Sequence, residues 1–289
     1  MTQHNLIQEG AVLLQEGDDA EYLMYLSAHH ELVASALAVK AAHEINPDLQ
    51  VGCMIGMNGV YPASPKPEDV MNALGAMHQK YWYVEVHARG HYPRHILKKF
   101  ERKGYDFITE EDKKILAEGK VDYIGFSYYM SFATKYQGRN EKTFDYVPED
   151  FVRNTYLKAS DWGWQIDPIG LRIMLNKMYD RTQKPIFISE NGLGARDQLN
   201  SDFSIHDPYR IDYLKQHFKQ IEEAIDDGVD VIGYIMWGVI DIVSAGNCEM
   251  AKRYGVIYVD GDNLGNGTYK RYKKDSFKWY HDYIQAQHQ

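Results

Sequence analysis

Four apolar segments, separated by helical patterns, limit the folds open to this chain of 289 residues. They are residues 51–57 (VGCMIGM), 121–130 (VDYIGFSYYM), 185–189 (PIFIS) and 229–238 (VDVIGYIMWG). Strands that are nearly all apolar and alternate with helices indicate a parallel sheet covered on both faces. Two architectures fit, a doubly wound open sheet and a (β/α)₈ barrel. A whole barrel has eight strands in roughly 250 residues, so four strands indicate an open sheet or part of a barrel.

The helical segments carry start signals. Residues 18–21 (DDAE) resemble a capping box that opens a helix to about residue 45, with Leu26, Val33 and Leu37 on one stripe. Asp207-Pro208 predicts a cap followed by proline at the first helical position. Further helical patterns cover about 67–103, 168–180, 208–227 and 275–287, and a polar loop is expected at about 131–166. Because no linker or repeat interrupts the chain, residues 1–289 are expected to form a single domain.

Composition excludes several classes of protein. The formal charge of −9 argues against a nucleic-acid partner. No apolar run approaches the ~18 residues that span a bilayer, and the N-terminus lacks a signal-peptide pattern. Two cysteines, Cys53 and Cys248, do not make a disulfide framework. We therefore expect a cytoplasmic protein without a membrane partner, and the histidine spacing suggests neither a metal nor another cofactor.

Polar and aromatic side chains follow the predicted strands at their carboxyl ends, where functional residues of parallel α/β proteins gather. The residues in question are Ser127, Tyr128, Tyr129, Glu190, Asn191, Trp237, Asp241 and Ser244. An indole offers a flat apolar face for a sugar ring, and the polar groups can bind its hydroxyls. Each residue alone could belong to the core or to a loop, but their convergence indicates a carbohydrate site.

Four longer motifs carry a family resemblance. They are FISENG (187–192), DYIGFSYYMS (122–131), GWQIDPIGLR (163–172) and the 25-residue stretch from MWGVIDIVS to GVIYVD (236–260). In this order and spacing the chain resembles glycoside hydrolase family 1, the retaining β-glycosidases built on a (β/α)₈ TIM barrel.

The resemblance implies roles for individual residues. Glu190 corresponds to the nucleophile that forms a glycosyl-enzyme, and Tyr129 to a tyrosine that hydrogen-bonds this nucleophile. Trp237 corresponds to the tryptophan under the sugar of the inner subsite, and Trp164 to the aromatic residue that flanks the aglycone. Ser127 stands where many members have asparagine, so that contact is altered or lost.

The segment after the fourth strand departs from the common glucosidase pattern. Ser244-Ala245 replaces a Glu-Trp pair, and Lys252 and Tyr254 follow. A hydroxyl, an ammonium and a phenol are three donors suited to a phosphate. This resembles the 6-phospho-β-glucosidase branch, whose corresponding serine, lysine and tyrosine bind the 6-phosphate. A solvated surface pair, Lys252 and Arg253, is the alternative. Ala245 favours a gluco substrate, while 6-phospho-β-galactosidase stays open.

The second catalytic carboxyl group has no counterpart in the sequence. Retaining hydrolysis uses two carboxyl groups ~5–5.5 Å apart, and the family's acid/base glutamate lies in a Thr-Phe-Asn-Glu type motif after the fourth strand. Asn140-Glu141 lies in a polar loop, and Glu85 lies in a helical region. We therefore expect this chain to begin just after that motif and to cover roughly strands 5–8 with helices 4–8, as the C-terminal portion of an incomplete barrel.

Three hypotheses about function follow. The first is a hydrolase of phosphorylated β-glucosides, such as a disaccharide 6-phosphate, that depends on a missing N-terminal half or on self-association. Unpaired sheet edges would make such a chain poorly soluble alone. The second is a catalytically inactive half-barrel remnant or sugar-phosphate binding module. The third, an unrelated doubly wound protein, should carry a glycine-rich phosphate loop, which this sequence lacks.

Overall fold

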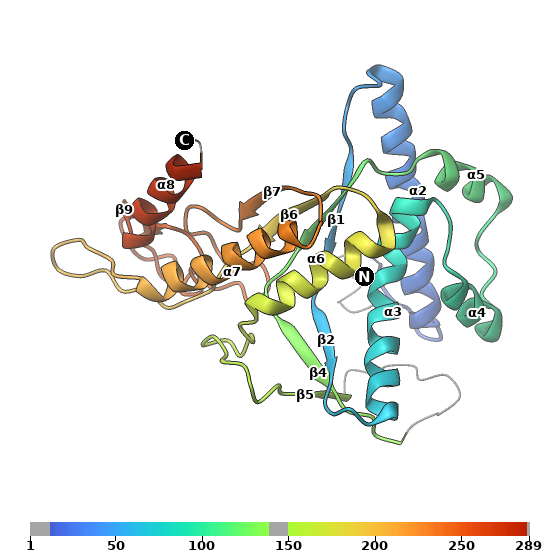
Figure 1. Cartoon of the computed structure of the whole chain (residues 1–289), viewed down its shortest axis with the longest axis horizontal. Coiled ribbons are helices and arrows are strands. Elements are labelled where there is room, and N and C mark those ends of the chain that lie inside the picture. Colours follow the sequence, from blue (N-terminus) through green and yellow to red (C-terminus); the bar gives the residue numbers. More distant parts are fainter. Residues whose placement is uncertain (1–11, 139–149, 288–289) are drawn as a thin grey trace. The chain divides into compact units, whose positions relative to one another are not determined.

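The computed structural model describes residues 12–138 and 150–287 and divides into two compact units (Figure 1). Unit 1 comprises Met1–Ile55, Met77–Gly125 and Met178–Pro185, and unit 2 comprises Gly56–Ala76, Phe126–Lys177 and Ile186–Gln289. The Asn140-Glu141 pair lies outside the described residues. Within those residues, no helix is long and apolar enough to cross a membrane.

All four predicted apolar segments form strands of one sheet. Its order is β1 (Gly52–Gly56), β3 (Tyr123–Ser127), β6 (Ile186–Asn191) and β7 (Val231–Met236). β6 and β7 pair in parallel. A doubly wound sheet reverses its strand order at a switch point, whereas this order runs in one direction along the chain. The order therefore favours the barrel type of α/β fold.

The structure also contains shorter strands that the sequence did not predict. β2 (Gly59–Pro62), β4 (Ser131–Thr134) and β5 (Phe151–Val152) form a three-stranded sheet, and β8 (Ile257–Val259) pairs with β9 (Arg271–Lys273). The expected loop at about 131–166 therefore contains β4 and β5. Strands of two to four residues are too short to show an apolar period, so nothing in the sequence distinguishes them from loop.

Unit 1 is built on an aromatic core beneath α2 (Ala20–Ile45). Its buried cluster is Tyr25, Ala28, Leu32, Ala36, Trp82, Val86, Tyr92, Ile96, Phe100 and Leu116. The predicted stripe is wrong for Leu37, which is 47% exposed, whereas Leu32, Ala36 and Val39 of the same helix are buried. The N-cap is Asp19, whose carboxylate accepts from Tyr22 N at 3.0 Å.

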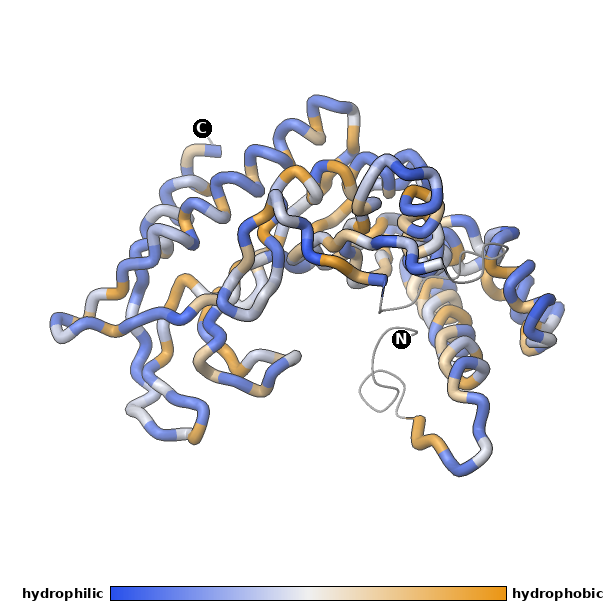
Figure 2. The backbone as a smooth tube through the Cα atoms, turned by 90° about the horizontal axis from the view of Figure 1, so that it is seen from below, coloured by the Kyte–Doolittle hydropathy of each residue, from blue (hydrophilic) through white to orange (hydrophobic). Residues whose placement is uncertain are grey.

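The helical stretch predicted at 67–103 is two helices, α3 (Pro67–Arg89) and α4 (Arg94–Lys103). Gly90 separates them at φ +72°, and a Cβ there would lie 2.5 Å from Leu116 O. An additional helix, α5 (Glu110–Glu118), begins at a capping box between Thr109 and Asp112. Along the helices, hydrophobic and hydrophilic residues alternate in short runs (Figure 2), as expected for helices that bury one face.

Unit 2 carries α6 (Pro168–Thr182), α7 (Pro208–Asp226) and α8 (Asp275–Gln287), with α6 continuing past Lys177 into unit 1. α8 packs beside α7 (Figure 1), where Tyr283 Oη donates to Glu222 at 2.9 Å. β7 is the last strand in the sheet order, and its Ile232 and Ile235 are each 50% exposed.

The side chain of Asp207, the predicted N-cap of α7, does not cap this helix. Asp207 is at the N-cap position with Pro208 following, but its side chain makes no cap hydrogen bond. Its carboxylate instead accepts from Ser276 N at 2.9 Å, Ser276 Oγ at 2.6 Å and Arg210 Nε at 3.0 Å. The residue thus joins the start of α7 to the start of α8 rather than closing its own helix.

Asp207 belongs to a buried charge network in unit 2. Arg210, 1% exposed, donates Nη2 to both oxygens of Asp197 at 2.8 Å. Lys274 Nζ donates to Asp197, and to Asp241 Oδ1 at 2.8 Å. Buried charges are tolerated when they are paired and hydrogen-bonded, so the carboxylates and cations of this network stabilise one another.

We expect Lys274→Met to destabilise the chain by about 3–5 kcal/mol, because it leaves Asp197 and Asp241 buried without this cation. Chemical denaturation of the full chain measures the effect. Lys278→Met is the matched control, since the Lys278 side chain is 81% exposed and forms its ion pair, within the described residues, with the exposed Asp282. It should change stability by less than about 0.5 kcal/mol. Equal effects of the two substitutions would contradict the structural role of Lys274.

Candidate active site

Glu190 lies near the carboxyl end of β6 in unit 2, where its half-buried carboxylate accepts a hydrogen bond from Tyr129 Oη at 2.9 Å. Backbone pairing brings the two segments together, because Tyr128 N donates to Glu190 O at 2.9 Å. The sequence-predicted pair of Glu190 and Tyr129 therefore forms a direct contact. Ser127, the last residue of β3, is buried at the same strand end.

Asn191 fixes this strand end, a role that the sequence analysis missed. The residue is fully buried, and its amide donates to Tyr128 O at 2.6 Å and to Tyr213 Oη at 3.0 Å. Tyr234 Oη donates to Asn191 Oδ1 at 3.0 Å. Because these bonds connect β6 to the end of β3, to α7 and to β7, they hold the backbone next to Glu190. The sequence placed Asn191 among the candidate site residues but did not indicate this structural role.

The electrostatics of Glu190 combine two opposing influences. Burial raises the pKa of the Glu190 carboxyl group, and the Tyr129 hydrogen bond lowers it. Burial and the nearby Glu190 charge raise the pKa of Tyr129, so its phenol stays protonated and donates. Burial and then Glu190 likewise raise the pKa of Tyr254. Besides burial, Tyr129 is the only side chain among the described residues that is found to shift the pKa of Glu190.

Aromatic rings extend from this pair. The ring of Tyr129 lies edge-on to Trp164, with 5.4 Å between centroids, and edge-on to Tyr254 at 6.1 Å. Trp237 follows β7, and its backbone N donates to Asn191 O at 2.9 Å. A Cβ on Gly192 would lie 3.8 Å from Trp237 Cβ, so the indole residue borders the turn after Glu190.

Lys252 lies among these rings. Its Nζ is 3.7 Å from the ring centroid of Trp164 and 5.4 Å from that of Trp162, and it donates to Asn247 Oδ1 at 2.9 Å. Lys252 is 1% exposed and Arg253 is 6% exposed, so a solvated surface pair is wrong. Burial lowers the pKa of the Lys252 ammonium, and the neighbouring Glu249 opposes this shift.

Gly194 provides the room for Lys252. A Cβ at this position would lie 2.9 Å from Lys252 Cε and 3.1 Å from Tyr254 Cζ. Ser244 is 3% exposed, and its backbone N donates to Glu249 O at 3.0 Å. Glu249 in turn accepts from Trp162 Nε1 at 3.1 Å. The loop from Ser244 to Lys252 is thus tied to the loop that carries Trp162 and Trp164.

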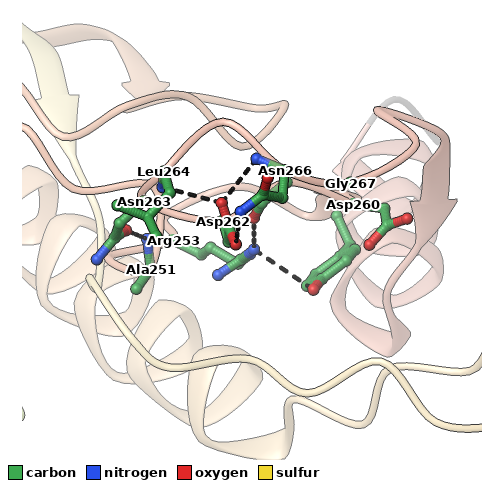
Figure 3. Close-up of a pocket in the computed structure, with 10 residues that line it drawn as sticks. Ala251, Arg253, Asp260, Asp262, Asn263, Leu264, Asn266 and Gly267 are labelled. Atoms are coloured by element: carbon green, nitrogen blue, oxygen red, sulfur yellow. Dashed lines mark hydrogen bonds between the residues drawn. The ribbon is translucent and has the colours of Figure 1, made fainter.

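A cleft of about 530 Å³ opens elsewhere in unit 2 (Figure 3). Its polar groups bond to one another: Asp262 accepts from Leu264 N and Asn266 N, and Arg253 donates to Gly261 O at 2.6 Å. None of the predicted site residues lines it. We interpret the residues that line this cleft as a support that fixes the side chain of Arg253, whose neighbours in the chain are Lys252 and Tyr254. No group of three or more potential metal ligands occurs in the described ranges 12–138 and 150–287.

Comparison with known proteins identifies the class. The profile of glycosyl hydrolase family 1 matches residues 12–289, and this chain therefore belongs to that family of glycosidases, which has the α/β TIM-barrel class of fold. The solved family 1 β-glucosidase from Thermotoga maritima superposes with a TM-score of 0.77 at 30% identity, over 91% of this chain and 57% of that chain.

Individual relatives point to one branch of this family. The aryl-phospho-β-D-glucosidase BglA of Bacillus subtilis is 53% identical over 95% of this chain and 58% of its own length. The 6-phospho-β-glucosidase AscB of Escherichia coli is 45% identical over 96% of this chain and 58% of its own length. The chain thus spans less than two thirds of the length of these relatives.

We expect Tyr129→Phe to raise the pKa of Glu190 further, because burial then acts without the opposing hydrogen bond. A smaller fraction of the carboxyl group is then ionised at a given acidic pH. A carboxyl ¹³C NMR titration, with Glu190→Gln to assign the signal, measures the change. Tyr156→Phe is the control, since Tyr156 is 96% exposed. An unchanged or lowered pKa in Tyr129→Phe would contradict the role of this hydrogen bond.

Proposed function

We propose that this chain supplies the nucleophile and the phosphate-binding residues of a retaining 6-phospho-β-glucosidase. The observation that carries the proposal is the Glu190 carboxylate at a strand end, hydrogen-bonded by a protonated Tyr129. The names of these relatives, phospho-β-glucosidases at 45–53% identity, support the choice of substrate class.

In this proposal Glu190 is the nucleophile. One carboxylate oxygen attacks the anomeric carbon, and the bond to the aglycone oxygen breaks, which gives a covalent glycosyl-enzyme. The acid/base carboxyl group then takes a proton from water, the water oxygen bonds to the same carbon, and the bond to Glu190 breaks, which releases the sugar with retained configuration. Tyr129 binds Oε2, which leaves the other oxygen for attack and favours the ionised form of the carboxyl group.

The surrounding residues bind the substrate. Trp237 stacks under the sugar ring, Trp164 flanks the aglycone, and Ser127 makes an altered substrate contact in place of the family's asparagine. Ser244, Lys252 and Tyr254 bind the 6-phosphate by charge-assisted hydrogen bonds. The Lys252 ammonium contacts the rings of Trp164 and Tyr254. Both rings pack against Tyr129, which hydrogen-bonds Glu190, and this connection supports the assignment.

Free Cys53 and Cys248 support a cytoplasmic setting.

We further propose that the acid/base carboxyl group comes from polypeptide outside this chain, which here covers strands 5–8 of the barrel. Three observations support this. Glu85, which the sequence analysis considered as a second carboxyl group, forms an ion pair with Arg181 at 2.6 Å within unit 1. No carboxylate among the described residues is identified as shifting the pKa of Glu190. The apolar side chains Ile232 and Ile235 on the last strand of the sheet are half exposed.

The nucleophile is tested with an aryl 6-phospho-β-glucoside that has a good leaving group. Because such a leaving group needs little protonation, we expect a burst of about one equivalent of phenol, followed by slow turnover. Intact-mass spectrometry should show one 6-phosphoglucosyl adduct, and peptide mapping should locate it on Glu190. Glu190→Gln should show neither burst nor adduct.

Three other results would contradict parts of this proposal. A burst that persists in Glu190→Gln would exclude Glu190 as the nucleophile. Rapid sustained turnover by the chain alone would show that it holds its own acid/base group. Tight binding of glucose 6-phosphate without any adduct would identify a sugar-phosphate binding module.

The phosphate assignment is tested with Lys252→Ala. We expect its KM for the 6-phosphorylated aryl glucoside to rise by about 10- to 100-fold, the range for a hydrogen bond to a charged group. The KM for the unphosphorylated analogue should change far less. The exposed Lys158, changed to alanine, is the control. Equal effects of Lys252→Ala on both substrates would remove the phosphate role of Lys252.

A further inference from the structure

A second cation lies beside Lys252. Ala195 and Arg253 form an antiparallel bridge, with Ala195 N to Arg253 O at 2.9 Å and Arg253 N to Ala195 O at 3.0 Å. In antiparallel pairing, the next residues on the two segments stand across from each other. Here these residues are Arg196 and Lys252, so the bridge brings two positive charges together.

Both cations reach the same indole. Arg196 Cζ lies 4.8 Å and Lys252 Nζ 5.4 Å from the ring centroid of Trp162. Arg196 is exposed, and among the described residues its guanidinium forms no ion pair. A guanidinium stacked on an aromatic face keeps its edge donors free for an anion. Like charges across from each other are destabilising, so an anion between them would relieve their repulsion.

Charge balance indicates which anion. A phosphomonoester carries about −1.5 to −2 charges at neutral pH. Lys252 supplies one positive charge, and the nearby Glu249 carboxylate, which raises the pKa of Lys252, adds a negative charge to the same loop. Arg210 and Lys274 are paired within the buried network. Ser244, Lys252 and Tyr254 alone therefore leave most of the charge of a phosphomonoester unmatched.

We propose that Arg196 is a specificity-determining residue that binds the phosphoryl group of the substrate together with Lys252, across the platform of Trp162. This inference rests on the proposed function, since it assumes that the site receives a phosphorylated sugar. Arg196 is the exposed cation that the phosphate meets first, and Lys252 is the buried one.

The test is a titration of the full chain with glucose 6-phosphate and with glucose, followed by tryptophan fluorescence or calorimetry. We expect the unaltered chain to prefer glucose 6-phosphate. Arg196→Gln should weaken glucose 6-phosphate binding by about tenfold and leave glucose binding unchanged. Arg196→Lys should restore part of the affinity, because it keeps the charge but not the planar fork. Arg153→Gln is the control, since Arg153 is an exposed cation in the loop that leads to Trp162.

The outcomes separate this inference from the proposed function. If the unaltered chain prefers glucose 6-phosphate and Arg196→Gln keeps that preference, the role of Arg196 is wrong and the phosphate site stands. Equal losses in Arg196→Gln and Arg153→Gln would also overturn it, because the effect would then be general electrostatics. If the unaltered chain binds both sugars equally, the phosphate assignment itself fails.

Discussion

The candidate site depends on a buried ionic junction at Asp241. Lys274 donates to its Oδ1 at 2.8 Å, and Arg253 Nε lies 3.4 Å from its Oδ2. Gly255 N donates to the same carboxylate at 2.9 Å. The segment that carries Ser244 follows Asp241 in the chain. The segment that carries Lys252 and Tyr254 also includes Arg253 and Gly255, which both contact Asp241. Both ends of the proposed phosphate loop are therefore fixed by charges that cannot be solvated in place, and loss of one partner leaves the other uncompensated.

A second constraint acts on Glu190. To act as the proposed nucleophile, this carboxyl group must be ionised, while the enclosure that excludes water disfavours the charged form. Tyr129 offsets this effect with one hydrogen bond, and its own pKa is raised by the same enclosure and by the charge it stabilises. The two groups thus hold each other in opposite protonation states. Asn191 keeps them in register by joining the ends of β3, β6 and β7 through its amide.

Much of the fold could be predicted because buried parallel strands leave continuous apolar runs, and all four such runs form the main sheet. Contacts between residues that are far apart in the sequence could not be predicted. Asp207 looks like a helix cap in sequence, yet its carboxylate binds Ser276, 69 residues away. Leu37 looks like a core residue, yet it is exposed, and the buried face of α2 is formed by Tyr25, Ala28, His29, Leu32, Ala36 and Val39. The placement of Arg196 across from Lys252 depends on the single bridge between Ala195 and Arg253, almost sixty residues apart, for which no local pattern exists.

The burial of Lys252 has a consequence for recognition. Its ammonium is almost inaccessible before any ligand arrives and keeps one hydrogen bond to Asn247 and close contact with Trp164. Dehydration of a cation is a large part of the cost of most ion pairing. Here that cost falls on folding, because the ammonium has already exchanged water for aromatic faces. The phosphate proposed as its ligand would then meet a charge that is already desolvated and oriented, which is the condition under which electrostatic attraction gives selectivity.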